Sequence, residues 1–88
     1  MTLKLRTGVS TAEVEYGTAL LDEDRGEYWN LNPTGALVLQ TLLSGSSRDE
    51  AAETLAAEFG IDIEDAVRDV DELIENLQAA GLVDRRSA

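Results

Sequence analysis

The chain has 88 residues, which suits one domain with a thin core and leaves little room for a deep, enclosed active site. It contains neither cysteine nor histidine, and this excludes disulfides, thiolate metal sites, and the commonest general base and metal ligand. Eighteen acidic and seven basic residues give a net charge of −11. Such a charge repels phosphate backbones and attracts basic partners, although acidity of this kind also keeps a small domain soluble.

The N-terminal segment, Met1–Arg6, holds no apolar run of the length that a signal peptide needs. No stretch of the sequence approaches the roughly 18 apolar residues of a membrane span. We therefore expect a soluble, cytoplasmic protein that has no membrane partner.

Residues 2–31 alternate between apolar and polar side chains, as β-strands do. Ala12, Val14 and Tyr16 alternate with glutamates, and two further extended runs cover residues 18–22 and 27–31. The polar loop between these two runs ends in a glycine, which is typical of a β-hairpin. We expect one N-terminal, three-stranded antiparallel sheet within residues 2–31.

Helical periodicity replaces this alternation from Asn32 onward, and it predicts helices over residues 33–44, 47–59 and 62–80. Asn32 is a good N-cap for the first helix, and the proline that follows it fits the first helical position. Ser47 and Glu50 have the spacing of a capping box at the start of the second helix. Gly60 is expected to end that helix.

The third helix carries more apolar residues than one neighbouring helix would cover. One stripe at helical spacing is followed by a second one beside it, made of Val67, Ile74 and the polar Asp71. The first stripe comprises Ile63, Ala66, Val70, Leu73 and Leu77. The width of this apolar face predicts that the third helix also contacts another surface besides the neighbouring helices.

A small sheet followed by three helices with short connections indicates an α+β fold. The arrangement is similar to a winged helix-turn-helix with the sheet placed first. We expect residues 1–88 to form a single domain of this kind.

The residues that remain for chemistry do not form a recognisable catalytic or metal site. Carboxylate pairs are frequent, but they fall on the outer face of a helix, where acids are usually solvated. The loop Asp22–Gly26 resembles a calcium loop but lacks the bidentate glutamate that should follow it. No glycine-rich phosphate loop is present, and no histidine could activate a hydroxyl. The sequence therefore predicts a protein that is not an enzyme and that holds no metal or cofactor.

A winged-helix regulator that binds DNA is the alternative suggested by the fold. Its third helix should neutralise phosphates, whereas the third helix here carries a single base, Arg68, among six acids. The acids are Glu64, Asp65, Asp69, Asp71, Glu72 and Glu75. This charge pattern disfavours DNA or any other nucleic acid as a partner.

A peptide-binding surface is more consistent with the last strand, residues 27–31. An unpaired edge strand can accept an extended peptide, and tryptophan and tyrosine are frequent interface anchors. Packing alone also accounts for part of this strand: Trp29 and Leu31 suit the core, where they could still line a groove, and Tyr28 suits the surface.

Two stretches resemble the PqqD-like family. One is YWNLNPTGALVLQTLL, residues 28–43, in which a strand enters an Asn-x-Thr-Gly helix start and an aliphatic stripe. The other is FGIDIEDAVRDVDELIENLQAAGLV, residues 59–83, with an acidic helix start, paired aliphatic residues and a terminal Gly-Leu. With the preceding hairpin, the resemblance covers residues 16–83.

The resemblance implies a recognition element that binds the leader of a ribosomally made precursor peptide. It further implies that the leader adds as a strand beside the third strand and packs against the third helix. Short acidic members with this junction look most like the lasso-peptide type, in which a separate leader peptidase and a cyclase act on the precursor. The alternative is the peptide chaperone of pyrroloquinoline quinone synthesis. The residues implied are Glu27, Tyr28, Trp29, Asn30 and Leu31 on one wall, and Val67, Val70, Asp71 and Ile74 on the other.

Overall fold

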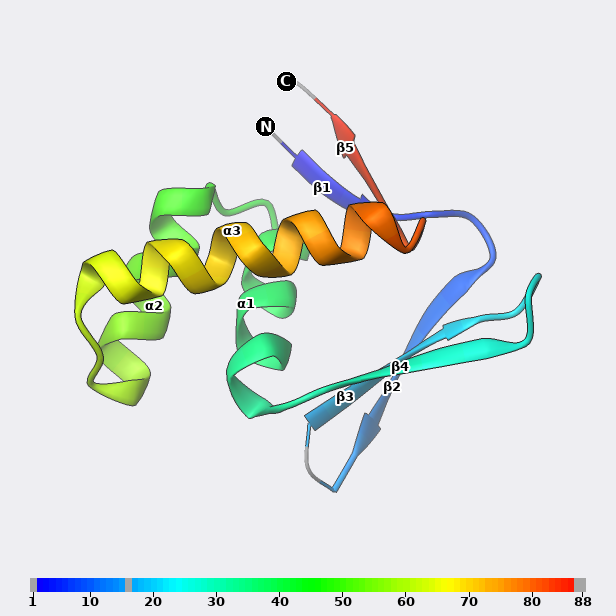
Figure 1. Ribbon diagram of the computed structural model, residues 1–88, viewed down its shortest axis with the longest axis horizontal. Helices are drawn as coiled ribbons and strands as arrows, with labels where there is room; N and C mark the ends of the chain where they lie inside the picture. The colour runs from blue at the N-terminus through cyan, green and yellow to red at the C-terminus, as the bar shows by residue number, and fades with distance from the viewer. Residues whose placement is uncertain (1, 16, 87–88) are drawn as a thin grey trace.

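The computed structural model describes residues 2–15 and 17–86, so Tyr16 lies outside the described residues. Figure 1 shows the helices gathered on one side and a β-sheet projecting away from them. The elements in chain order are β1 (Thr2–Leu5), β2 (Val9–Val14), β3 (Gly17–Asp22), β4 (Glu27–Leu31), α1 (Pro33–Leu43), α2 (Arg48–Phe59), α3 (Ile63–Ala79) and β5 (Val83–Arg86).

The projecting sheet is antiparallel and has the strand order β2-β3-β4. Because alternate side chains point to opposite faces of a strand, the register assigns each residue to one of two faces. Leu20 lies opposite Thr11 and Trp29 and is fully buried, so these three residues mark the inner face, toward the helices. The α+β class and the order of a three-stranded antiparallel sheet before three helices are confirmed.

A second sheet was not foreseen from the sequence. β1 leaves the three-stranded sheet and pairs with β5 in antiparallel fashion, with Leu3 opposite Arg85 and Leu5 opposite Val83. Leu3 is 2% exposed and Val83 is 6% exposed, so both belong to the core. The sheet expected within residues 2–31 is therefore wrong for residues 2–5, and the winged-helix description fits only loosely.

The helices α1 and α2 begin where their capping residues predict. The Asn32 side chain accepts a hydrogen bond from Gly35 N at 2.8 Å, and Ser47 and Glu50 form both bonds of a capping box. Gly60 ends α2 in the left-handed conformation. Asp62 occupies the N-cap position of α3 but makes no side-chain capping bond. Within the described residues, no helix is both long and apolar enough to span a membrane.

The core lies among the three helices and the small sheet β1-β5. Each helix contributes a buried stripe, and Leu20 is the one fully buried apolar residue from the middle of the projecting sheet. The helical contributions are Val38, Leu39 and Leu42 from α1, Ala51, Ala52 and Leu55 from α2, and Ala66, Val70, Ile74 and Leu77 from α3. The projecting sheet thus rests on the helical body through α1, which contacts β3 and β4.

Gly17 lets the sheet and α1 meet closely. Its φ is +145°, in the region that favours glycine, and a Cβ placed there would lie 1.9 Å from the carbonyl oxygen of Leu31. Leu31 ends β4 and leads directly into the cap of α1. A side chain at residue 17 would therefore push the start of β3 away from the strand-to-helix junction.

We expect Gly17→Ala to destabilise the fold by about 2 kcal/mol or more, because it combines a disfavoured φ with a backbone clash. Urea unfolding followed by circular dichroism would measure the loss. Gly45→Ala is the matched control, since Gly45 also has a positive φ, +100°, but a Cβ there would meet nothing within 4 Å. Equal losses in the two variants would contradict the importance of the Leu31 contact.

Candidate functional site

The strand β4 has one free edge. It pairs with β3, and among residues 2–15 and 17–86 no strand lies along its other side. The residues from Glu27 to Asn30 are exposed. Backbone donors and acceptors on this edge are therefore open to solvent and can pair with another extended chain.

One of the two aromatic residues of β4, Trp29, is more exposed than the sequence suggested. Trp29 is on the inner face but is 39% exposed, so its assignment to the core is wrong. Tyr28 lies on the outer face and is 66% exposed, whereas Leu31 is buried at 9%. The reason is position, because β4 meets α1 at its Leu31 end and extends from there away from the helices (Figure 1).

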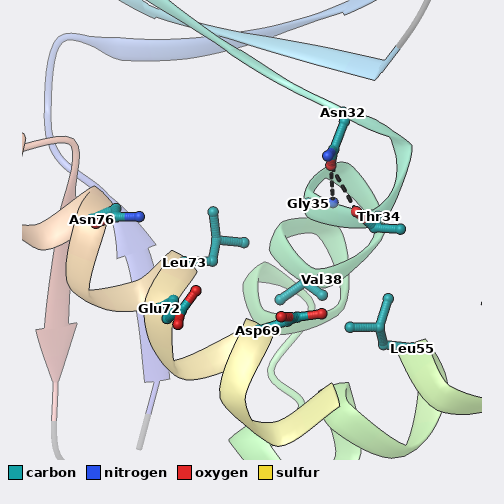
Figure 2. Close-up of a pocket in the computed structure, with 9 residues that line it drawn as sticks. All are labelled: Asn32, Thr34, Gly35, Val38, Leu55, Asp69, Glu72, Leu73 and Asn76. Atoms are coloured by element: carbon teal, nitrogen blue, oxygen red, sulfur yellow. Dashed lines mark hydrogen bonds between the residues drawn. The ribbon is translucent and has the colours of Figure 1, made fainter. Parts of the chain in front are cut away.

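A cleft of about 290 Å³ opens where the end of β4 turns into α1. Figure 2 shows side chains from all three helices around it, with α3 facing the first turn of α1. Pockets for whole small molecules typically measure about 300–1,000 Å³, so this volume suits one or two side chains of a larger ligand. The lining residues are Asn32, Thr34, Gly35, Val38, Leu55, Asp69, Glu72, Leu73 and Asn76.

The cleft has an apolar floor and an acidic rim. Val38 and Leu55 are 2% and 1% exposed, and Leu73 of α3 is half-buried beside them. Asp69 and Glu72 are exposed on the neighbouring turns of α3. Such a surface can hold an apolar side chain at its base and a cationic group at its edge. Among the described residues, no three histidine, cysteine or acidic side chains gather as metal ligands would.

The α3 residues that the sequence suggested for this wall lie elsewhere. Val70 and Ile74 are 0% and 2% exposed, so they belong to the core and do not line the cleft. Val67 is half-buried outside the cleft. Asp71 is held by Arg48 of α2, with Arg48 Nε 3.1 Å from Asp71 Oδ1. The expected wall of Val67, Val70, Asp71 and Ile74 is therefore not the surface that faces the cleft.

The geometry of a helix explains why these residues do not line the cleft. Each residue turns the helix by about 100°, so Leu73 and Val67 lie about 60° to either side of the buried line through Val70. Leu73 and Val67 are both half-buried. The hydrophobic periodicity of the sequence therefore does not show which of the two sides of the helix is in contact with a neighbouring element. The Leu73 flank faces α1 and the cleft. The ion pair between Asp71 and Arg48 shows that the other flank faces α2. The sequence signals for the flank that lines the cleft were Leu73 itself and its neighbour at helical spacing, Asn76.

The Asn-x-Thr-Gly segment explains how the cleft is framed. The Asn32 Oδ1 atom accepts hydrogen bonds from Thr34 Oγ1 at 2.7 Å and from Gly35 N at 2.8 Å. A Cβ on Gly35 would lie 3.3 Å from that same oxygen, so a larger residue would crowd the cap. The segment therefore fixes the angle between β4 and α1.

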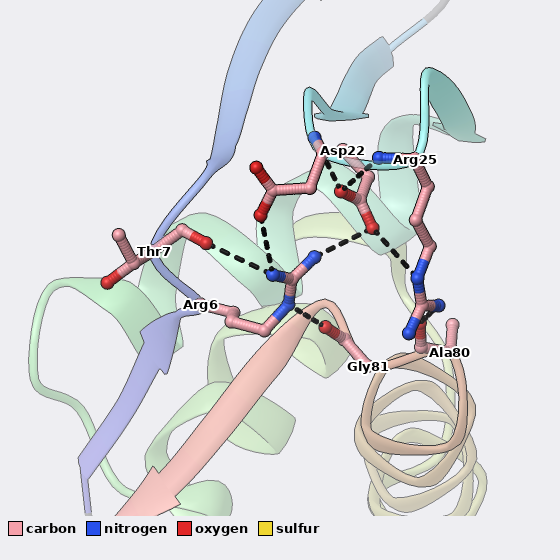
Figure 3. Close-up of polar contacts among 7 residues, drawn as sticks. Arg6, Thr7, Asp22, Arg25, Ala80 and Gly81 are labelled. Atoms are coloured by element: carbon pink, nitrogen blue, oxygen red, sulfur yellow. Dashed lines mark hydrogen bonds and ion pairs between the residues drawn. The ribbon is translucent and has the colours of Figure 1, made fainter.

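A buried carboxylate fixes the far end of β3. Asp22 is 1% exposed, and its Oδ2 atom accepts a hydrogen bond from Arg6 Nη2 at 2.7 Å (Figure 3). Its Oδ1 atom accepts bonds from the backbone N–H groups of Asp24 and Arg25, both at 3.2 Å. We call this group of Arg6, Asp22, Asp24 and Arg25 the Asp22 junction.

The Asp22 junction also holds the end of α3. Arg6 Nε donates to the carbonyl oxygen of Gly81 at 2.6 Å, and Arg25 Nη1 donates to that of Ala80 at 3.3 Å. The last turn of α3 contains no basic residue of its own. Since the C-terminal end of a helix carries partial negative charge, these two guanidinium groups supply the cations that it lacks. The β3–β4 turn and the end of α3 are thereby tied together.

The charged groups of the Asp22 junction shift one another's pKa values. Burial raises the pKa of Asp22, but the hydrogen bonds from Arg6 and from the Arg25 backbone outweigh burial and hold it below the ordinary 3.8. The Arg6 pKa is raised, chiefly by its hydrogen bond to Asp22. In the capping box of α2, the Ser47 backbone and side chain lower the pKa of Glu50 below its ordinary 4.5.

We expect Asp22→Asn to unfold at a lower urea concentration than the unaltered chain at pH 7. A carboxylate whose pKa is lowered by folding stabilises the fold above its ordinary pKa, and this contribution disappears as the pH falls through the lower folded value. The variant should therefore lose less stability than the unaltered chain between pH 5 and about pH 3. Urea titrations over that range test this, with Glu53→Gln on the exposed face of α2 as control; parallel curves for all three proteins would contradict it.

Comparison with known proteins gives the family to which the chain belongs. Among curated proteins none matches the sequence. In the solved structure of a protein described as lasso peptide synthetase B1 complexed with the leader peptide, the matching chain is 39% identical, with 97% of this chain and 100% of that chain covered and a TM-score of 0.91. A second structure, of TbiB1 in complex with the TbiA(beta) leader peptide, is 22% identical, covers 97% and 99% of the two chains and has a TM-score of 0.84, which is a likeness of fold. The model of the family described as coenzyme PQQ synthesis protein D (PqqD) matches residues 17–83, and the chain belongs to that family.

Proposed function

We propose that this protein binds the leader region of a ribosomally synthesised precursor peptide during lasso-peptide maturation. The observation that carries the proposal is the free edge of β4, which runs into a cleft between α1 and α3. The chain is also similar, over nearly its full length, to a lasso peptide synthetase B1 that was solved in complex with the leader peptide, and this similarity supports the same role.

The leader is proposed to add as a strand along Glu27–Leu31. An extended peptide on a free edge gains backbone hydrogen bonds that fix its register, and its alternate side chains point to the two faces of the sheet. On the inner side these would reach the exposed part of Trp29 and the apolar surface of Leu73. One or two such apolar anchors typically provide most of the binding energy.

The acidic rim adds a preference for positive charge. Asp69 and Glu72 lie beside the apolar floor, in a chain whose net charge is −11. A leader with a lysine or arginine near its apolar anchor would be attracted there, and salt would weaken the attraction by screening these exposed charges. The Asp71 carboxylate, already paired with Arg48, has no part in this selection.

These features support a role in which the domain binds the leader and catalyses no reaction on it. The protein would present the bound precursor to the leader peptidase and the cyclase of the same pathway. The second candidate is a peptide chaperone of pyrroloquinoline quinone synthesis, which the description of the family favours. Titrating the protein with a lasso leader and with a precursor of the quinone pathway separates the two candidates by affinity.

Strand addition predicts a specific pattern of hydrogen exchange. On binding a leader, the alternate amides of β4 that point away from β3 should become protected, because each would then donate to the added strand. Amide exchange followed by NMR would report this pattern. The free edge of β2 provides the internal control, and protection of Val9–Val14 in place of Glu27–Leu31 would move the site to the opposite edge of the sheet.

The two flanks of α3 provide a matched pair of variants. Leu73→Ala should weaken leader binding by about five- to tenfold, since it removes roughly 1 kcal/mol of apolar contact from the cleft. Val67→Ala should leave the affinity unchanged, because Val67 is also half-buried but does not line the cleft. Fluorescence anisotropy with a labelled leader measures both. A loss of leader affinity in Val67→Ala alone would indicate that the leader contacts the flank of α3 that the sequence suggested.

A further inference from the structure

The strand β4 and the helix α3 border one groove and run in opposite directions (Figure 1). Arg25, just before β4, donates to the carbonyl oxygen of Ala80 at the end of α3. Asn32, just after β4, lines the same cleft as Asp69 in the first half of α3. The start of the strand therefore lies near the C-terminal end of α3, and its last residue lies near the turns around Asp69.

Charge is distributed along this groove in three zones. Glu27 is an exposed acid on the inner face at the start of β4. Trp29 follows two residues later on the same face, and Leu73 of α3 adds a second apolar surface in the cleft. Asp69 and Glu72 border the cleft at the end where β4 turns into α1. The groove thus presents acids at both ends and an apolar surface between them.

These acids have no cationic partner within residues 2–15 and 17–86. No ion pair joins Glu27, Asp69 or Glu72 to another described residue. The arginines nearest to them in the sequence, Arg25 and Arg68, are paired with other acids. Cations on a ligand would therefore meet carboxylates whose charge is not already compensated.

We propose that the groove selects extended peptides in which one apolar residue has a lysine or arginine two positions before it and another two positions after it. The proposal rests on the proposed function, because it requires the leader to add as a strand to β4. Alternate side chains of such a strand point to the inner face and are roughly 7 Å apart. Leu73 and Asp69 are four residues apart on α3, which is about 6 Å along the helix axis. An apolar residue beside Leu73 therefore places the next inward residue beside Asp69.

The same spacing applies toward the start of β4. An apolar residue opposite Trp29 places the residue two positions away opposite Glu27, because both lie on the inner face of β4. Lysine and arginine suit both flanking positions, since their aliphatic stems can cover apolar surface while the charged group stays in water beside a carboxylate. The pattern is the same when read in either direction, so it holds for a leader that runs parallel or antiparallel to β4.

The outward side chains of the leader would meet no such charge. The outer face of β3 and β4 presents Ala19, Leu21, Tyr28 and Asn30, none of which is charged. Lysines directly before and after the apolar residue would lie on this face, because neighbouring side chains of a strand point to opposite faces. The groove therefore selects the position of the basic residues in the peptide and not only their number.

Two synthetic peptides of identical composition test the pattern. Each is a short, otherwise uncharged sequence of strand-forming residues with one central leucine and two lysines. The lysines lie two positions from the leucine in the first peptide and directly beside it in the second. Fluorescence anisotropy should show that the first binds about five- to tenfold more tightly, because it gains two exposed charge pairs. Added salt should reduce this difference by screening those pairs.

Variants of the protein assign the preference to the groove. Glu27→Gln should remove the contribution of one lysine, and Asp69→Asn combined with Glu72→Gln that of the other, each lowering the difference between the peptides about two- to threefold. Two further peptides, with a single lysine two positions before or two positions after the leucine, should respond to different variants. Glu58→Gln, on the exposed surface of α2, also removes one negative charge and should leave the difference unchanged.

The outcomes separate failure of the pattern from failure of the proposed function. Equal affinity for the two isomeric peptides, or a difference that survives the substitutions in the groove, would overturn the pattern. Binding of a lasso leader without binding of either peptide would overturn it as well. If neither a lasso leader nor any of these peptides protects the amides of β4 from exchange, the proposed function itself is refuted.

Discussion

The position of the projecting sheet depends on the buried carboxylate of Asp22. Among the described elements, α1 makes the main packing contact with this sheet, in which Leu20 and Leu31 are buried, and a two-layer contact of this size would leave the hairpin end free to swing. Asp22 prevents this because one carboxylate accepts from Arg6 and from the turn that follows β3. Arg6 and Arg25 then reach the last carbonyls of α3. The fold tolerates this buried acid because both carboxylate oxygens of Asp22 accept hydrogen bonds, which compensate for the lost hydration of the charge.

This constraint matters because the proposed binding surface is shared between two parts of the molecule. One wall is a strand of the sheet and the other is a helix of the body, so their separation is set by the Asp22 junction at one end and the Asn32 cap at the other. A ligand strand that meets a preformed gap loses less free energy to ordering the protein. For a domain of 88 residues with a thin core, two polar anchors fix this geometry with very few side chains.

Local features of the fold could be predicted from the sequence, whereas features that depend on distant partners could not. Asn32, Ser47 and Gly60 act within one turn of chain, so their capping roles could be predicted from neighbouring residues alone. The pairing of β1 with β5 joins the two ends of the chain and leaves no local periodicity to detect. Likewise the free edge of β4 follows from its being the last strand of the sheet, but which flank of α3 faces it depends on how α2 and α3 pack. The ion pair between Arg48 and Asp71 marks the flank that faces α2, and nothing in the spacing of these two residues indicates that they would pair.

The three sides of β4 therefore have different chemistry. Its backbone edge is open and suits an added strand, its inner side presents Trp29 toward the helices, and its outer side presents Tyr28 within an uncharged patch. A peptide added at this edge would take on the same division, with one set of side chains held by the cleft and the other displayed outward. Under the proposed function, the acidic surface would favour basic leaders and keep copies of the domain apart.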